Sequence, residues 1–115
     1  MPQVLKRNRV VDLAKTFIRK LLKSDLIPVK EVYLYGSYAY GTPDEWSDID
    51  IAVITDREFE FEELIDLEAR VRRLAREIDI RIEPVIFTST DRLGFMESEV
   101  KKGIRIYPEV KNGQV

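Results

Sequence analysis

The residues from Val32 to Ile54 decide the fold, and they read Val-Tyr-Leu-Tyr-Gly-Ser-Tyr-Ala-Tyr-Gly-Thr-Pro-Asp-Glu-Trp-Ser-Asp-Ile-Asp-Ile-Ala-Val-Ile. An apolar strand ends at Gly36-Ser37, a polar loop follows, and a second strand begins near Asp48. Alternate residues of a strand point to the same face, so the side chains of Asp48 and Asp50 are predicted to lie together. The rest of the second strand is apolar on both faces, which is typical of a strand inside a sheet.

The two halves of this stretch favour nucleotide chemistry. Two unpaired carboxylates at a strand end repel each other and are costly to desolvate, and a divalent cation relieves both penalties. Glycine lets a backbone approach a ligand closely. Ser37 is predicted to be a helix N-cap, and a helix start offers free N–H groups to a phosphate. A phosphate-binding turn beside a dicarboxylate site indicates a protein that handles nucleotides together with magnesium.

Gly36-Ser37, ten further residues and then Asp48-x-Asp50 resemble the signature of the polymerase-beta-like nucleotidyltransferases, and the short chain resembles their minimal members. The resemblance implies that Asp48 and Asp50 hold two Mg²⁺ ions, for which Mn²⁺ can substitute. It implies that Gly36 and Ser37 touch the phosphates of ATP or another NTP, and that a third carboxylate lies on a later strand. The reaction implied is transfer of a nucleoside monophosphate, AMP in the case of ATP, to an acceptor hydroxyl.

The resemblance also implies a partner. Small members of the family resemble antitoxins that bind a helical HEPN-type ribonuclease and can modify it with AMP, which would place the acceptor hydroxyl on the partner protein. The alternative is a non-catalytic antitoxin or binding module that keeps the nucleotidyltransferase fold. One departure favours the alternative, because many family members carry arginine where this chain has Tyr38 or Tyr40.

Two acidic residues, Asp79 and Glu83, compete for the role of third carboxylate and metal ligand. They are separated by about 13 Å along a strand, so both cannot reach the same cations. Asp79 directly follows a helix, where an exposed acid needs no explanation. Glu83 lies mid-strand beside Pro84, where an acid is expected to have a partner. We therefore predict Glu83, with Asp79 as the alternative and Arg81 as a neutralising neighbour or phosphate contact.

The hydrophobic pattern predicts an α+β fold, a small mixed β-sheet with helices packed mainly on one face. The expected helices are Val4–Lys23, Phe59–Ile78 and Thr88–Lys102, and the expected strands are Val29–Tyr35, Asp48–Thr55, Asp79–Thr88 and Ile104–Tyr107. In the third strand, Ile80, Ile82 and Ile86 are expected to share the inner face. Pro84 predicts either an edge position or an end to the strand pairing at that residue. The outer face of the first helix is basic, which fits either a solvated surface or a contact with an acidic partner or RNA.

Length and composition narrow the function classes. A chain of 115 residues predicts one domain over residues 1–115, and the resemblance covers a core of about residues 29–107. The absence of cysteine and histidine excludes disulfides, zinc–thiolate sites and catalysis by either residue. The net charge of −2 does not itself indicate a nucleic acid. With no long apolar run and no signal-peptide pattern, the expected location is cytoplasmic and no membrane contact is predicted.

Overall fold

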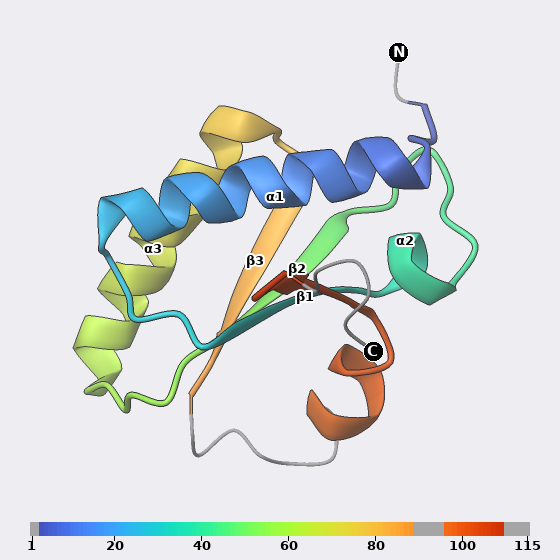
Figure 1. Ribbon diagram of the computed structural model, residues 1–115. Helices are drawn as coiled ribbons and strands as arrows, with labels where there is room; N and C mark the ends of the chain where they lie inside the picture. The colour runs from blue at the N-terminus through green and yellow to red at the C-terminus, as the bar shows by residue number, and fades with distance from the viewer. Residues whose placement is uncertain (1–2, 89–95, 110–115) are drawn as a thin grey trace.

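The computed structural model describes residues 3–88 and 96–109, and its centre is a four-stranded sheet in the order β3-β2-β1-β4 (Figure 1). Strand β1 is antiparallel to β2 and β4, whereas β2 and β3 are parallel. The strands are β1 Glu31–Tyr35, β2 Ile49–Ile54, β3 Ile82–Phe87 and β4 Ile104–Tyr107, and the helices are α1 Arg7–Ser24, α2 Ser37–Tyr40, α3 Phe61–Ile78 and the π-helix η1 Met96–Val100. The predicted mixed sheet is confirmed.

The main core lies between one face of the sheet and the helices α1 and α3. Both helices are amphipathic, so each buries one apolar stripe and leaves its charged face in water. The stripes contribute Val10, Leu13, Ala14, Phe17, Ile18 and Leu21 from α1, and Leu67, Val71 and Ala75 from α3. These side chains pack on inward-facing residues of all four strands, among them Leu34, Ile51, Ile82 and Ile106.

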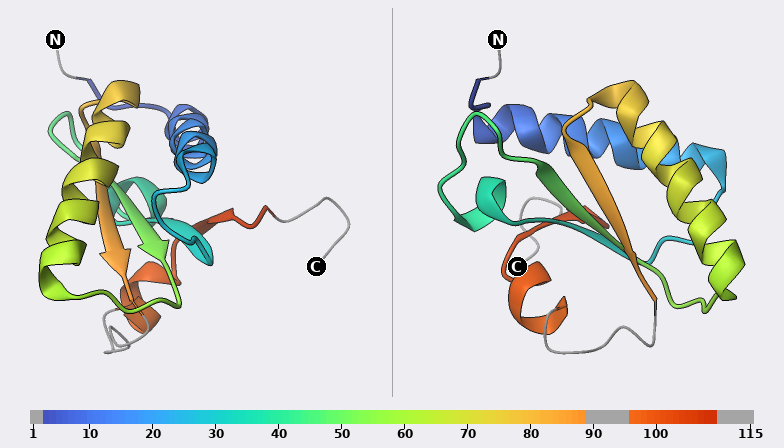
Figure 2. Two further views of the ribbon diagram at one scale, coloured as in Figure 1. Left: turned by 90° about the vertical axis from the view of Figure 1, so that its left-hand side faces the viewer. Right: turned by 180° about the vertical axis from the view of Figure 1, so that it is seen from behind.

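The opposite face of the sheet is only partly covered. A smaller apolar cluster there joins Tyr33, Tyr35, Ala52 and Ile54 to Val100 of η1. Figure 2 shows η1 at the end of the molecule away from α1 in both views. The prediction that the helices pack mainly on one face is therefore confirmed, and the second face leaves room for a site.

The junction between α3 and β3 differs from the prediction. Strand β3 begins at Ile82 rather than Asp79, because Asp79 caps α3 through a bond from its N–H to the carbonyl oxygen of Ala75, 3.0 Å away. Ile80 consequently lies on a turn, 79% exposed, so its predicted place on the inner face was wrong. The predicted edge position of the Pro84 strand is confirmed, because β3 is the last strand of the sheet on its side.

The last predicted helix, Thr88–Lys102, is also corrected. Thr88 is buried and not helical, residues 89–95 lie outside the described part of the chain, and the helical turn observed is η1. After η1, Gly103 packs so closely on β1 that the Leu34 carbonyl oxygen occupies the space that a Cβ would need. Strand β4, the short strand that the sequence predicted, begins at the next residue.

Helix α1 also begins later than predicted, at Arg7 rather than Val4. Asp25, directly after its last residue Ser24, adopts the left-handed conformation with φ 56°. In the described part of the chain, no helix combines the length and apolar character that a bilayer crossing requires.

Candidate active site

Asp50 lies on the central strand β2 between two partners on neighbouring strands. Its register partner on β1 is Tyr35 and its register partner on β3 is Glu83. Asp48 precedes β2 and is exposed, and its charge acts on Asp50 together with that of Glu83. The structure thus brings all three acids to one end of the sheet, on the face that α1 and α3 leave open.

Gly36 joins the end of β1 to this acidic group. Its φ of +77° belongs to the left-handed region that favours glycine, and Asp50 Oδ2 occupies the space that a Cβ at position 36 would need. The Gly36 carbonyl accepts bonds from the N–H groups of Ala39 and Tyr40, at 3.0 and 3.1 Å. Gly36 is therefore the N-cap of α2 and Ser37 its first helical residue, so the predicted N-cap was one residue too late.

The acids of the site repel one another. Burial, together with the charges of Asp48 and Glu83, raises the pKa of Asp50 to about 6. Burial and the charge of Asp50 likewise raise the pKa of the Tyr35 hydroxyl to about 12. Carboxylate oxygens that repel each other fit a hard divalent cation. The fit is limited to a pair of ligands, because among the described residues no three acidic side chains are grouped closely enough to form a metal site.

Glu83 has a partner, as the sequence predicted for a mid-strand acid, but the partner is not Arg81. Two arginines of α3 reach it: Arg72 Nη2 lies 2.9 Å from Glu83 Oε1, and Arg76 Nη2 lies 3.6 Å from Glu83 Oε2. They can do so because β3 is an edge strand that packs beside α3. Glu83 is consequently held at the sheet edge next to Asp50, with two arginines beside its carboxylate.

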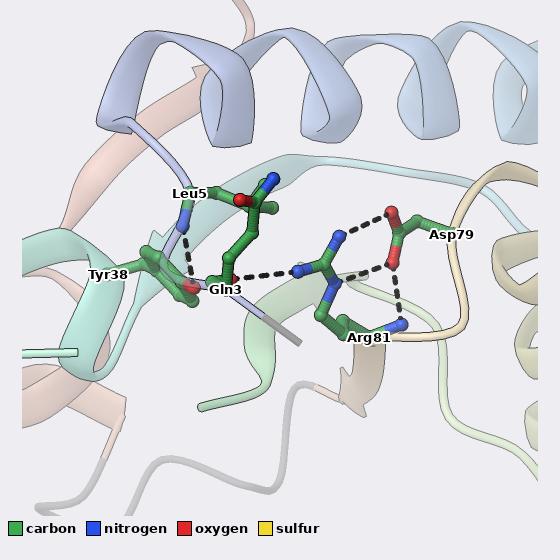
Figure 3. A network of polar contacts seen from close by, with 5 residues as sticks. All are labelled: Gln3, Leu5, Tyr38, Asp79 and Arg81. Carbon is green, nitrogen blue, oxygen red and sulfur yellow. Dashed lines mark hydrogen bonds and ion pairs between the residues drawn. The ribbon is translucent and has the colours of Figure 1, made fainter. Parts of the chain in front are cut away.

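Asp79 belongs to a different network (Figure 3). Arg81 Nε and Nη2 donate to the two oxygens of Asp79 at 3.2 and 3.3 Å, and the Arg81 N–H adds a third bond of 2.8 Å. Burial alone would raise the pKa of Asp79, but these bonds and the charge of Arg81 hold it below its usual value. Arg81 Nη1 also donates to the Gln3 carbonyl, so Asp79 serves to fix the turn and the N-terminal segment.

A cavity of about 740 Å³ opens beside Asp48, a feature that sequence reasoning missed. Its walls include Trp46 and Ile80, which are 73% and 79% exposed. Polar bonds of Asp44 to the Trp46 N–H and to Ser47, at 2.8 to 3.3 Å, hold the loop that carries Trp46. The available signal was a tryptophan in an otherwise polar loop two residues before Asp48.

Comparison with known proteins is consistent with this geometry. A family model described as polymerase beta nucleotidyltransferase matches residues 16–112. A relative from Methanocaldococcus jannaschii that carries the name protein adenylyltransferase is 28% identical over 100 residues, which cover 84% of this chain and 98% of the relative.

Two solved structures share the fold. A nucleotidyltransferase from Sulfolobus solfataricus matches with a TM-score of 0.60 and 22% identity, covering 86% of this chain and 88% of the other. A chain from the complex of tri-AMPylated HEPN toxin with MNT antitoxin of Shewanella oneidensis matches with a TM-score of 0.54 and 24% identity, covering 84% and 71%.

We expect Gly36→Ala to destabilise the protein through two separable effects. The positive-φ backbone at position 36 costs about 1–3 kcal/mol for a residue with a Cβ, and overlap with Asp50 costs about 1–3 kcal/mol more. In an Asp50→Ala background only the first cost should remain. Urea denaturation in EDTA of the wild type, both single variants and the double variant measures the coupling free energy between the two positions. The same comparison of Gly36→Ala in an Asp48→Ala background is the control. Equal costs of Gly36→Ala in both the wild-type and the Asp50→Ala background would contradict the contact.

The raised pKa of Asp50 predicts a pH dependence of stability. Between pH 4 and 6 the native state retains a proton that the unfolded chain has lost, so stability falls as pH rises through this window. After allowance for solvent screening, the loss is about 1–2 kcal/mol. Asp50→Asn should remove this loss. The free energy of unfolding of the variant should therefore rise relative to that of the wild type between pH 4 and pH 7 in EDTA. Exposed Asp56→Asn is the matched control, and parallel pH profiles of wild type and Asp50→Asn would contradict the assignment.

Proposed function

This chain belongs to the polymerase beta nucleotidyltransferase family, and we propose on that basis that it transfers AMP from ATP to a hydroxyl group of a partner protein. The observation that carries the proposal is the contact between the Asp50 carboxylate and Gly36. Because of this contact, the turn proposed to bind phosphate and the acids proposed to bind the cation form one site.

We assign the roles as follows. Asp48 and Asp50 would hold Mg²⁺, for which Mn²⁺ can substitute, and Glu83 would complete the acidic group. The backbone at Gly36 and Ser37 would bind the phosphates that leave as pyrophosphate, since the first N–H groups of a helical turn have no partner within that turn. Bound magnesium ions would neutralise charge on the triphosphate. Proteins of this family use divalent metals, and the mutual repulsion around Asp50 is what a cation would relieve.

The proposed reaction is an in-line displacement at the α-phosphorus of ATP. The acceptor oxygen forms a bond to this phosphorus, while the bond to the bridging oxygen breaks and pyrophosphate leaves with the electron pair. The acceptor hydroxyl proton would pass to Glu83 and from there to solvent.

The cavity beside Asp48 is the proposed entry for the acceptor. Asp48 is part of its lining, and exposed Trp46 and Ile80 offer an apolar platform. A related protein carries the name protein adenylyltransferase, and a chain of the same fold occurs in a complex with a tri-AMPylated HEPN toxin. We therefore propose that the acceptor lies on a helical HEPN-type partner, and that this chain acts as its antitoxin.

One observation favours the alternative of a non-catalytic antitoxin that only covers its partner. Glu83 is paired with Arg72 and Arg76, so its charge is already compensated without a cation. In that case the partner would be bound but not modified.

Intact-mass measurement decides between the two functions. The chain is co-expressed with the proteins encoded beside it, and the purified complex is incubated with ATP and Mg²⁺. We expect the partner's mass to rise by one or more AMP units, and we expect no rise in EDTA or with the Asp48→Asn/Asp50→Asn double variant. A stable complex whose mass never changes would support the non-catalytic alternative, and retention of no partner would overturn both.

The choice of third carboxylate gives a second prediction. Glu83→Gln should leave ATP binding within a few-fold but reduce transfer by roughly 100-fold, the usual scale for loss of an acid–base group. Asp79→Asn should retain transfer yet lower the melting temperature, because Arg81 loses its paired carboxylate. Single-turnover transfer and thermal unfolding are measured on both variants. An inactive Asp79 variant beside an active Glu83 variant would reverse the assignment.

A further inference from the structure

A cation from the C-terminal segment lies beside α2. Lys102 Nζ is 5.8 Å from the centre of the Tyr40 ring and 3.3 Å from Glu99 Oε1. The Tyr40 hydroxyl donates to the other oxygen of Glu99, at 3.1 Å. Tyr40, Glu99 and Lys102 therefore form a small polar cluster that links the last turn of α2 to the segment following η1.

This cluster adjoins the turn at Gly36. The Tyr40 N–H donates to the Gly36 carbonyl oxygen at 3.1 Å, so the residue that contacts Lys102 is bonded to the turn. Gly103 fixes the backbone next to Lys102, because it packs directly on the Leu34 carbonyl two residues before Gly36. Lys102 thus lies beside Tyr40 of α2, and the residue that follows it packs on β1, the strand that ends one residue before Gly36.

The turn itself has no positively charged side chain to bind a phosphate, and Lys102 could supply one. Residues 37–41 read Ser-Tyr-Ala-Tyr-Gly and carry no cationic side chain. The triphosphate of ATP carries about four negative charges, and phosphate oxygens are bound in proteins by backbone N–H groups together with Lys or Arg. A lysine ammonium group supplies three donors and a compact charge, which suits a terminal phosphate.

We propose that Lys102 binds the β- or γ-phosphate of the ATP held at the Gly36–Ser37 turn, an inference that rests on the proposed function. The move from Glu99 to phosphate costs little, because the Lys102 and Glu99 side chains are 57% and 40% exposed and such surface ion pairs are weak. Glu99 keeps the Tyr40 hydroxyl as a partner when the lysine leaves. A triphosphate offers Lys102 more negative charge than the single carboxylate it replaces.

The test compares Lys102→Met with Lys102→Arg and with the neighbouring Lys101→Met. Calorimetry with Mg²⁺ measures binding of AMP and of an ATP analogue whose bridge between the α- and β-phosphates cannot be cleaved. We expect Lys102→Met to weaken the analogue roughly 10-fold or more, the scale of a charged hydrogen bond. AMP binding should stay unchanged, Lys102→Arg should remain within a few-fold of wild type, and Lys101→Met should bind both ligands normally. Steady-state transfer should show a higher KM for ATP with kcat little changed.

The outcomes separate this inference from the function it rests on. If the wild type binds the analogue and Lys102→Met binds it equally well, the role of Lys102 is overturned while the nucleotide site stands. Equal loss of AMP and analogue would also overturn it, because that pattern indicates a disturbed fold rather than a lost phosphate contact. If the wild type does not bind the analogue at all, the proposed function fails and this inference falls with it.

Discussion

The contact between Asp50 and Gly36 is the constraint on which the site depends. A carboxylate on the central strand fills the space that any side chain at position 36 would need. The antiparallel pairing of β1 and β2 makes this possible, because it places Tyr35 directly opposite Asp50 and turns the chain at the next residue. The end of one strand and the start of the other therefore cannot be separated without opening the sheet. Rigid elements hold both halves of the site, which suits chemistry that relies on positioning.

The edge of the sheet completes this arrangement. Because β3 is parallel to β2 and lies outermost, Glu83 is brought level with Asp50 and remains within reach of α3. Arg72 and Arg76 pair with Glu83, while the charges of both Asp48 and Glu83 still raise the pKa of Asp50. Asp79, four residues earlier, is bound by Arg81 in a separate network that fixes the turn. Two acids close in sequence thus have different partners because one precedes the strand and the other lies within it.

The sequence predicted the parts of the fold that depend on local patterns. Strand alternation placed Asp48 and Asp50 together, Pro84 marked the edge strand, and the apolar stripes of α1 and α3 gave the core face. The sequence-based predictions failed where backbone bonds override the local pattern. Ile80 fits the alternation of a strand, but the cap of α3 at Asp79 interrupts that strand. Ser37 is a good N-cap residue, but Gly36 before it already caps α2.

Contacts between segments distant in the sequence could not be predicted at all. No spacing in the sequence pairs Arg72 with Glu83 or brings Lys102 to Tyr40, and the cavity beside Asp48 arises from the loop, the α3–β3 turn and the N-terminal segment together. The catalytic roles of Asp48, Asp50, Glu83, Gly36 and Ser37 stay predictions.

The repulsion around Asp50 also couples cation binding at the site to the stability of the fold. A carboxyl group whose pKa lies near 6 is ionised at neutral pH at the expense of native stability. A cation bound by Asp48 and Asp50 would remove that penalty. Because the unfolded chain does not fix the geometry of these two acids, the cation would bind the native state in preference. Cation binding and stability are therefore thermodynamically coupled through Asp50. The acidic group is a local weakness in the free protein, of the kind expected where function rather than packing determines which residues are placed together.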